Sequence, residues 1–188
     1  MTAPRAWRLT GVLLILALGA LGGCPPRAAR PEAIEKSTGV NQMTDALKRI
    51  CDLISSSPMT AGELAGKLGT VTRDLGGDLQ VEFRPTDARF AAGEVTRKFG
   101  TQDASSVGLT LVAGQSLPLA DLQSAFGPFQ IGPKVHHDRP DLASFHLPPL
   151  PGRTFTCSIL AEVTPGAHGI DDATTSKLVI VREVVLPD

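Results

Sequence analysis

The sequence predicts an α+β fold in which helices pack on an antiparallel sheet, behind an N-terminal signal and tether. Three observations support this prediction. The chain of 188 residues is long enough for one compact domain with extra segments. Apolar residues recur at helical spacing from position 43 onward. Several later segments alternate apolar with polar residues, as strands with one exposed face do.

The first 23 residues have the parts of a secretory signal. Two arginines precede an apolar run that extends from Leu9 to Leu21, and two glycines follow it. The run is shorter than the roughly 20 residues that a membrane-spanning helix needs. We therefore expect residues 1–23 to be a signal peptide, with an uncleaved membrane anchor as the alternative.

The end of this run, Leu21-Gly22-Gly23-Cys24, resembles a bacterial lipobox. The resemblance implies that Cys24 receives a diacylglyceryl group, that the signal is cut before it, and that the new amine is acylated. Two or three acyl chains then hold a protein to a membrane stably. Because Pro25 rather than Asp follows Cys24, the sorting rule of enteric lipoproteins implies the outer membrane, facing the periplasm. The alternative is an ordinary signal peptide with a coincidental cysteine.

Residues 25–42 are rich in proline, alanine and charged residues and show no sustained apolar period. We expect residues 24–42 to be the lipidated cysteine and a flexible tether, leading to a folded domain over 43–188. Without residues 1–23 the chain carries 16 basic and 19 acidic residues, a net charge of −3. This balance disfavours nucleic-acid binding and a cationic surface lying on the membrane.

Two helices are predicted at the start of the domain. The first ends at the Ser55–Pro58 segment, and its apolar face consists of Met43, Ala46, Leu47, Ile50, Cys51 and Ile54. The second begins with a capping box between Thr60 and Glu63, in which each side chain accepts a hydrogen bond from the other residue's backbone N–H. Gly69 is the expected residue after its end.

Alternating segments predict strands in the rest of the domain. In residues 78–84, Leu79, Val81 and Phe83 should face the core. Further strands are expected within 94–99, 107–111, 155–163 and 177–186. The stretches 127–152 and 165–176 are polar or rich in proline and are expected to be loops. Because the first is unusually long for a compact domain, we expect it to be a contact region for a partner.

A short pattern occurs twice in the domain. Leu64, Leu68 and Gly69 recur, 58 residues later, as Leu122, Phe126 and Gly127. Pro118 stands where it can be the first residue of the second helix. The chain therefore has either two tandem helix-plus-strands modules, over 58–113 and 116–188, or one ordinary α+β domain with two similar helices.

The first copy carries a family resemblance. Met59-Thr60-x-x-Glu63-Leu64-x-x-x-Leu68-Gly69, followed by a strand-rich segment, resembles the start of the module in the small lipoprotein subunit of the outer-membrane β-barrel assembly machinery. A tandem pair of such modules resembles the β-lactamase-inhibitor-protein fold, with helices packed on an antiparallel sheet. The sequence departs from this pattern in lacking the aromatic residues that such interaction surfaces often use. The resemblance implies a binding module rather than an enzyme.

Two cysteines remain if Cys24 is acylated. Cys51 lies on the apolar face of the first predicted helix, and Cys157 lies on the inward face of a predicted strand. An exported protein meets oxidising conditions, so we expect a disulfide between these two residues. Two buried thiols that pack as small apolar groups are the alternative.

The sequence offers little chemistry for catalysis or for metals. His136, His137 and His146 are weak metal-ligand candidates, because adjacent residues of an extended chain point to opposite sides and structural zinc usually needs four ligands. We expect a solvated loop there, and no metal or cofactor. Nucleophile-elbow, zinc-protease and phosphate-binding motifs are absent. A nucleophile pair of Cys157 and His146 fits the spacing, but an inward strand position favours packing.

These observations predict a lipid-anchored, non-catalytic protein of the cell envelope that binds an envelope protein partner through its sheet or loops. A domain that binds a small or apolar ligand between its helices and its sheet is the second hypothesis. An exported hydrolase is the third. The sequence has no tyrosine, and its one tryptophan is Trp7, within the signal. Their absence from the domain disfavours sugar binding and a very tight protein interface.

Overall fold

The computed structural model describes residues 31–74, 76, 79–132, 140–149 and 152–185. Within them lie the helices α1 (Pro31–Ser56), α2 (Ala61–Leu68) and α3 (Leu119–Phe126). The strands are β1 (Gly69–Asp74), β2 (Gln80–Pro85), β3 (Phe90–Arg97), β4 (Ala104–Leu111), β5 (Leu117–Pro118), β6 (Phe129–Ile131), β7 (Leu142–His146), β8 (Phe155–Glu162), β9 (Thr164–Gly166), β10 (Gly169–Thr175) and β11 (Lys177–Val184).

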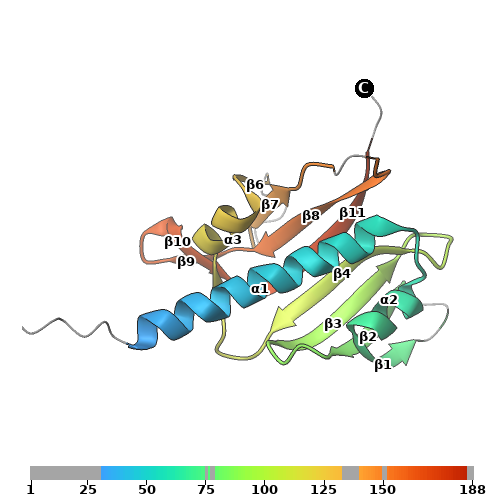
Figure 1. Ribbon diagram of the computed structural model, residues 1–188, viewed down its shortest axis with the longest axis horizontal. Helices are drawn as coiled ribbons and strands as arrows, with labels where there is room; N and C mark the ends of the chain where they lie inside the picture. Colours follow the sequence, from blue (N-terminus) through green and yellow to red (C-terminus); the bar gives the residue numbers. More distant parts are fainter. Residues whose placement is uncertain (1–30, 75, 77–78, 133–139, 150–151, 186–188) are drawn as a thin grey trace, which may run out of the picture.

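An eight-stranded antiparallel sheet is the main body of the fold (Figure 1). Its strands lie in the order β1-β2-β3-β4-β11-β8-β7-β6, and a small second sheet has the order β5-β10-β9. Helix α1 runs across the middle of one face of the large sheet, with α2 over β1, β2 and β3 and α3 against β7 and β10. The predicted α+β class, with helices packed on an antiparallel sheet, is confirmed.

The two halves of the large sheet follow the same order of elements. In the first half α2 precedes β1, β2, β3 and β4, and in the second half α3 precedes β6, β7, β8 and β11. Each half runs from an outer strand, β1 or β6, to the centre, where β4 and β11 pair antiparallel. This order is consistent with the tandem modules expected over 58–113 and 116–188.

Helix α1 begins at Pro31, well before the predicted start near position 43. Proline is favourable in the first turn of a helix, and the glutamates, alanine and lysine that follow are good helix formers. The predicted flexible tether is therefore wrong for residues 31–42, which are helical; the rest of it, 24–30, lies outside the described residues. The helix ends at Ser56, before Pro58, as predicted. All residues of its predicted apolar face are buried.

Helix α2 has the predicted capping box. The backbone N–H of Thr60 donates to Oε2 of Glu63 at 3.0 Å, and Oγ1 of Thr60 accepts from the backbone N–H of Glu63 at 3.3 Å. The hydrogen bond from the Thr60 backbone is the main cause that lowers the pKa of Glu63. Gly69 follows the helix with an extended φ of 175°. It is needed there for space, because a Cβ would lie 2.0 Å from the backbone oxygen of Arg84 on β2.

Helix α3 starts one position later than expected. Pro118, predicted as its first residue, is the N-cap and also belongs to β5. Gly127 ends the helix with φ at 89°, in the left-handed region that favours glycine. The repeated pattern thus ends each short helix with a glycine, for a different physical reason in each copy.

Some strands lie where loops were expected. Strands β6 and β7 fall within 127–152, and β9 and β10 occupy most of 165–176. β6 and β9 have three residues each and β10 pairs with β9 through a register shift, so these three strands show no sustained alternation. β7 does alternate over its five residues, with Ala143 and Phe145 buried, but the surrounding prolines hid it. The contact loop expected at 127–152 is therefore partly a strand pair. Leu79, expected in the core, is 55% exposed because it lies just before β2 begins.

Residue Arg97, at the end of β3, is a charged residue held inside the fold. It is 6% exposed, and its Nη2 donates to Oδ1 of Asp74 at 2.5 Å. This hydrogen bond is the main cause that lowers the pKa of Asp74. Because Asp74 ends the outer strand β1, the ion pair fastens the edge of the sheet to β3, two strands away.

A disulfide joins Cys51 of α1 to Cys157 of β8, with their Cα atoms 5.6 Å apart. Both residues are buried, at 3% and 2% exposure, in the core between the helices and the sheet. The bond connects residues 106 positions apart and fixes α1 to the second half of the sheet. In the part of the chain that the structure describes, no helix is long and apolar enough to cross a membrane.

Candidate functional site

One face of the large sheet is covered by helices, and no described element packs on the other. Along the central strands the residues facing the helices are buried, except at one end of β8 and β11 (Phe155, Arg182 and Val184). Those facing away are half-buried or exposed, apart from Gly108 and Ser158. We call the second surface the open face. Its central residues are Glu82, Glu94, Thr96, Ser106, Gly108, Thr110, Leu160, Glu162, Val179 and Val181.

The centre of the open face combines small and apolar side chains with carboxylates. A cross-strand row follows the register pairs from β2 to β7 through Glu82, Glu94, Gly108, Val179, Leu160 and Ser144. On β4 the outward positions hold Ser106, Gly108 and Thr110. The next strands carry the half-buried Val179 and Leu160. A solvated sheet face usually has polar residues at such positions, so Leu160, Val179 and Val181 form an apolar group among the polar residues of the open face.

A hollow of about 400 Å³ lies on the open face around Gly108. Polar residues from several strands line it, among them Glu82, Glu94, Thr110, Glu162 and Lys177. Gly108 leaves room for the neighbouring side chain, because a Cβ at this position would lie 2.9 Å from Cγ of Glu94. The absence of a side chain at Gly108 thus allows Glu94 to lie over β4.

Carboxylates outnumber cations around this hollow. Nζ of Lys177 lies 3.5 Å from Oε2 of Glu162, and Nη1 of Arg73 lies 3.3 Å from Oε1 of Glu82. Glu94 has no ion pair with any residue that the structure describes, and its register partner across the strands is Glu82. Like charges directly opposite each other on a sheet are destabilising. The hollow therefore favours the approach of a cation.

A serine, a histidine and a glutamate meet near the other side of the open face. Nδ1 of His146 lies 2.8 Å from Oγ of Ser158 and 3.8 Å from Oε2 of Glu183. A serine–histidine–acid relay places the acid on one ring nitrogen and the serine on the other, whereas here both oxygens face Nδ1. Ser158 is also 1% exposed. No sequence motif marks this cluster, since strand register brings its members together.

The structure describes only some of the sequence-predicted site residues. Cys24, His136 and His137 lie outside the described residues. His146, expected in a loop, ends β7 and contacts Ser158. Within the described ranges no group of three or more histidine, cysteine or acidic residues is placed to hold a metal ion. The sequence did not point to the hollow around Gly108, because only the register of β3 against β4 places Glu94 beside it.

Comparisons with known proteins add no family or relative to these observations. A scan against protein-family models, a search of curated proteins and a search of solved structures each found no match.

Proposed function

We propose that this chain is a lipid-anchored protein of the cell envelope, in the outer membrane and facing the periplasm, that binds another envelope protein without catalysing a reaction. The open face is the binding surface. The observation that supports this proposal best is the side of the eight-stranded sheet on which no described element packs, with small residues, half-buried apolar residues and a hollow at its centre.

The apolar part of the open face would supply free energy for binding a partner. Leu160, Val179 and Val181 lie side by side at the centre of the sheet and stay half-exposed to water. Apolar surface rimmed by polar groups is typical of protein–protein contact sites. Each square ångström of it that a partner covers contributes about 25 cal/mol.

The charges around the hollow define the partner's chemistry. An arginine or lysine placed in the hollow would pair with Glu94 and relieve its repulsion with Glu82. The partner we infer presents one basic side chain with apolar side chains beside it, which lie on Val179 and Leu160. Such a pair gives orientation and association rate more than affinity.

The envelope location rests on the N-terminal sequence and agrees with the cysteine chemistry. Leu21-Gly22-Gly23-Cys24 resembles a lipobox. The disulfide between Cys51 and Cys157 is of the kind that persists in oxidising compartments such as the periplasm. Mass spectrometry of the mature N-terminus tests the anchor: we expect an acylated Cys24. An unmodified residue there, or Cys24→Ala protein that stays in the membrane fraction unchanged, contradicts it.

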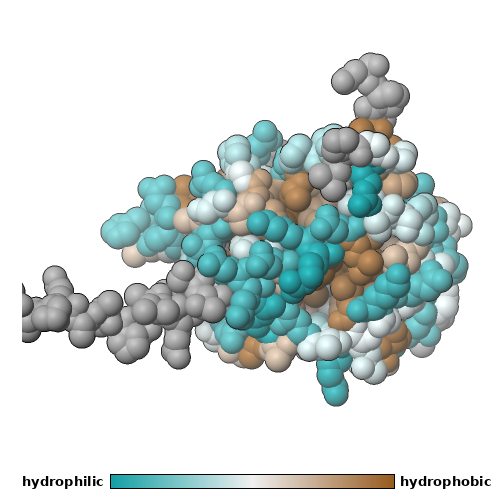
Figure 2. All heavy atoms as spheres, in the orientation of Figure 1, coloured by the Kyte–Doolittle hydropathy of each residue, from teal (hydrophilic) through white to brown (hydrophobic). Residues whose placement is uncertain are grey.

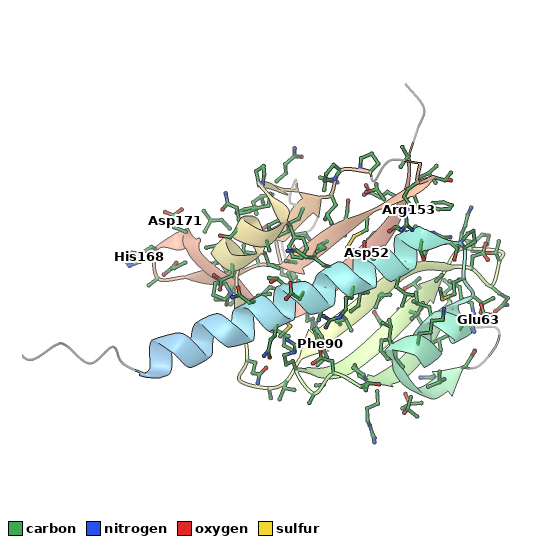
Figure 3. The ribbon with its side chains drawn as sticks, viewed as in Figure 1. Asp52, Glu63, Phe90, Arg153, His168 and Asp171 are labelled. Carbon is green, nitrogen blue, oxygen red and sulfur yellow. A yellow bond between two sulfur atoms is a disulfide. The ribbon has the colours of Figure 1, made fainter. Side chains whose placement is uncertain are left out.

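Photo-crosslinking in the native cell tests the binding surface. A benzophenone side chain replaces Thr110 on the open face, and in the control it replaces Asp52, which is exposed on α1 (Figure 3). We expect one envelope protein to be captured from position 110 and not from position 52. Capture from position 52 alone, or from neither position, contradicts the proposal.

Charge substitutions test the role of Glu94. Glu94→Lys should abolish capture from position 110, because it places a cation where the partner's cation binds. Asp52→Lys is the matched control, because Asp52 is an exposed carboxylate on α1, on the helix-covered side of the sheet and away from the open face (Figure 3). Undiminished capture with Glu94→Lys would show that the partner is not recognised by a basic side chain.

A further inference from the structure

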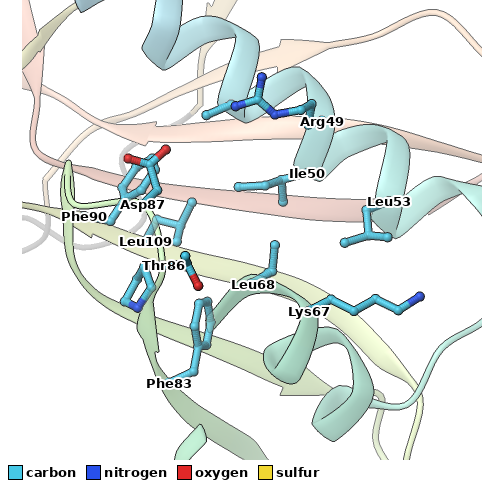
Figure 4. A pocket seen from close by; sticks show the side chains of 12 residues that line it. Arg49, Ile50, Leu53, Lys67, Leu68, Phe83, Thr86, Asp87, Phe90 and Leu109 are labelled. Carbon is cyan, nitrogen blue, oxygen red and sulfur yellow. The ribbon is translucent and has the colours of Figure 1, made fainter. Parts of the chain in front are cut away.

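A second hollow lies on the helix-covered side of the sheet, between α1, α2 and strands β2 to β4 (Figure 4). Its volume is about 400 Å³. We call it the helix groove. Its apolar walls consist of Ile50 and Leu53 from α1, Leu68 from α2, and Phe83, Phe90 and Leu109 from the sheet. Figure 2 shows apolar surface at this place, beside the polar outer stripe of α1.

Both helices place a cation at the rim of the helix groove: Arg49 on α1 and Lys67 on α2 (Figure 4). The one carboxylate among the lining residues, Asp87, accepts hydrogen bonds from Nε and Nη2 of Arg89. Arg89 is the main cause that lowers the pKa of Asp87, and the charge of Arg49 contributes. Arg49 therefore already has an anion near it inside the groove. The carboxylate on which the charge of Lys67 acts is Glu63, which is not among the lining residues, and Lys67 forms no ion pair with any residue the structure describes.

We propose that the helix groove binds a single-chain carboxylate amphiphile, such as a long-chain fatty acid, with its alkyl chain against the apolar walls and its carboxylate at Lys67. The walls supply the contact that an alkyl chain needs, and the rim supplies charge of the opposite sign to the headgroup. This arrangement, an apolar lining with few polar groups that orient the ligand, is typical of small-molecule sites.

The volume favours one chain over two. Cavities for small ligands range from about 300 to 1,000 Å³, and the helix groove, at about 400 Å³, is near the lower limit. A diacyl lipid has two chains to bury and is too large for it. Because the groove and the open face lie on opposite sides of the sheet, this proposal and the proposed protein partner fail independently.

A chain-length series tests the proposal on the chain from Pro25 onward, purified with its disulfide intact and stripped of lipid. Calorimetric titration with straight-chain carboxylates of increasing length should give one bound molecule per protein. We expect the affinity to rise about fourfold for each added methylene, which corresponds to about 0.8 kcal/mol, and to level off when the groove is full. The primary alcohol of the same length reports binding by the alkyl chain alone.

Two variants test where the carboxylate headgroup and the alkyl chain of the ligand bind. Lys67→Glu should weaken carboxylate binding about tenfold at low salt and leave alcohol binding unchanged, because it reverses one charge at the rim. Lys98→Glu, an equal charge change at an exposed residue outside the groove, should change neither. Leu53→Trp narrows the groove, and the affinity should then level off at a shorter chain.

The proposal is overturned by three results. No binding of any carboxylate is the first. The second is binding that Lys67→Glu and Leu53→Trp leave unchanged, since the amphiphile then sits elsewhere. The third uses the lipid-anchored protein in nanodiscs: if it binds no fatty acid while the unanchored chain does, the groove holds the protein's own acyl chain instead of a free ligand. Lys67 is exposed, so its variant folds even if Leu53→Trp does not.

Discussion

The disulfide between Cys51 and Cys157 is expected to supply a large part of the stability of the folded domain. It closes a loop of 106 residues. In the chain-entropy model a loop of this length removes enough freedom from the unfolded chain to stabilise the native state by about 5 kcal/mol. Whole domains are stable by about 5–15 kcal/mol. For a domain of about 150 residues the expected loss on breaking the bond is roughly 10–20 °C in Tm.

A double-mutant cycle separates the bond from the packing of the two side chains. Cys51→Ala, Cys157→Ala and the double variant are unfolded in urea, with the oxidised and reduced wild type beside them. Either single variant already breaks the bond, so the two single losses should sum to about 5 kcal/mol more than the loss of the double variant. The packing lost at each buried position stays additive.

Two results refute this reasoning. If the single losses add up to the loss of the double variant, there is no bond between the two sulfurs. If the unreduced native protein, once denatured, reacts with a thiol reagent at two sites, the cysteines are free and act as small apolar groups. A coupling near 5 kcal/mol together with a steeper urea dependence after reduction supports the entropic account, since the reduced unfolded chain exposes more surface.

Four further predictions concern local features. Gly69→Ala should destabilise the native state by about 3 kcal/mol, because its Cβ would lie 2.0 Å from the backbone of β2. Gly66→Ala should stabilise the native state by about 1 kcal/mol, because a Cβ at this position on α2 meets nothing within 4 Å. Both are read from urea unfolding. Thr60→Ala should cost about 1 kcal/mol in the same assay, since it removes the capping box of α2. Asp74→Asn should destabilise the native state at neutral pH. Hydrogen bonding from Arg97 lowers the pKa of Asp74 in the folded protein. The stabilisation by the ionised Asp74 is therefore present above its unfolded-state pKa of about 3.9 and is lost as the pH falls through the lower folded-state pKa. The variant and the wild type should therefore converge in stability below about pH 4, and a stability difference that persists unchanged at acid pH contradicts this explanation.

Patterns among neighbouring residues predicted the helices and strands whose signal lies within a short stretch of the sequence. The apolar period from Met43 to Ile54 and the pair of Thr60 and Glu63 each depend on neighbours along the chain, and both appear as expected. The strand around Cys157 alternates over a long enough stretch for its buried face to be read. The short strands β6 and β9 were not predicted, because three residues are too few to show an alternating pattern.

The candidate site was beyond sequence reasoning for a different reason. Val179 belongs to β11, where the run Leu178–Val181 is apolar on both faces, and such strands usually lie buried on both sides. Leu160 is the one apolar residue among the polar outward positions of β8. Nothing in their sequence states that only one side is covered. Likewise Gly108 reads as an ordinary strand glycine until register pairs it with Glu94. Helix α1 was cut short in the prediction because the residues before position 43 lack the apolar stripe that a packed helix shows.

The position of the disulfide has a mechanical consequence. Helix α1 has 26 residues, so it is about 39 Å long, and Cys51 lies near its far end from Pro31. Tension applied at Pro31 travels along the helix axis and reaches β8 through a covalent bond instead of through van der Waals contacts alone. In oxidised protein, single-molecule pulling from the N-terminus should therefore peel α1 only as far as that bond. In reduced protein the whole helix should detach at lower force.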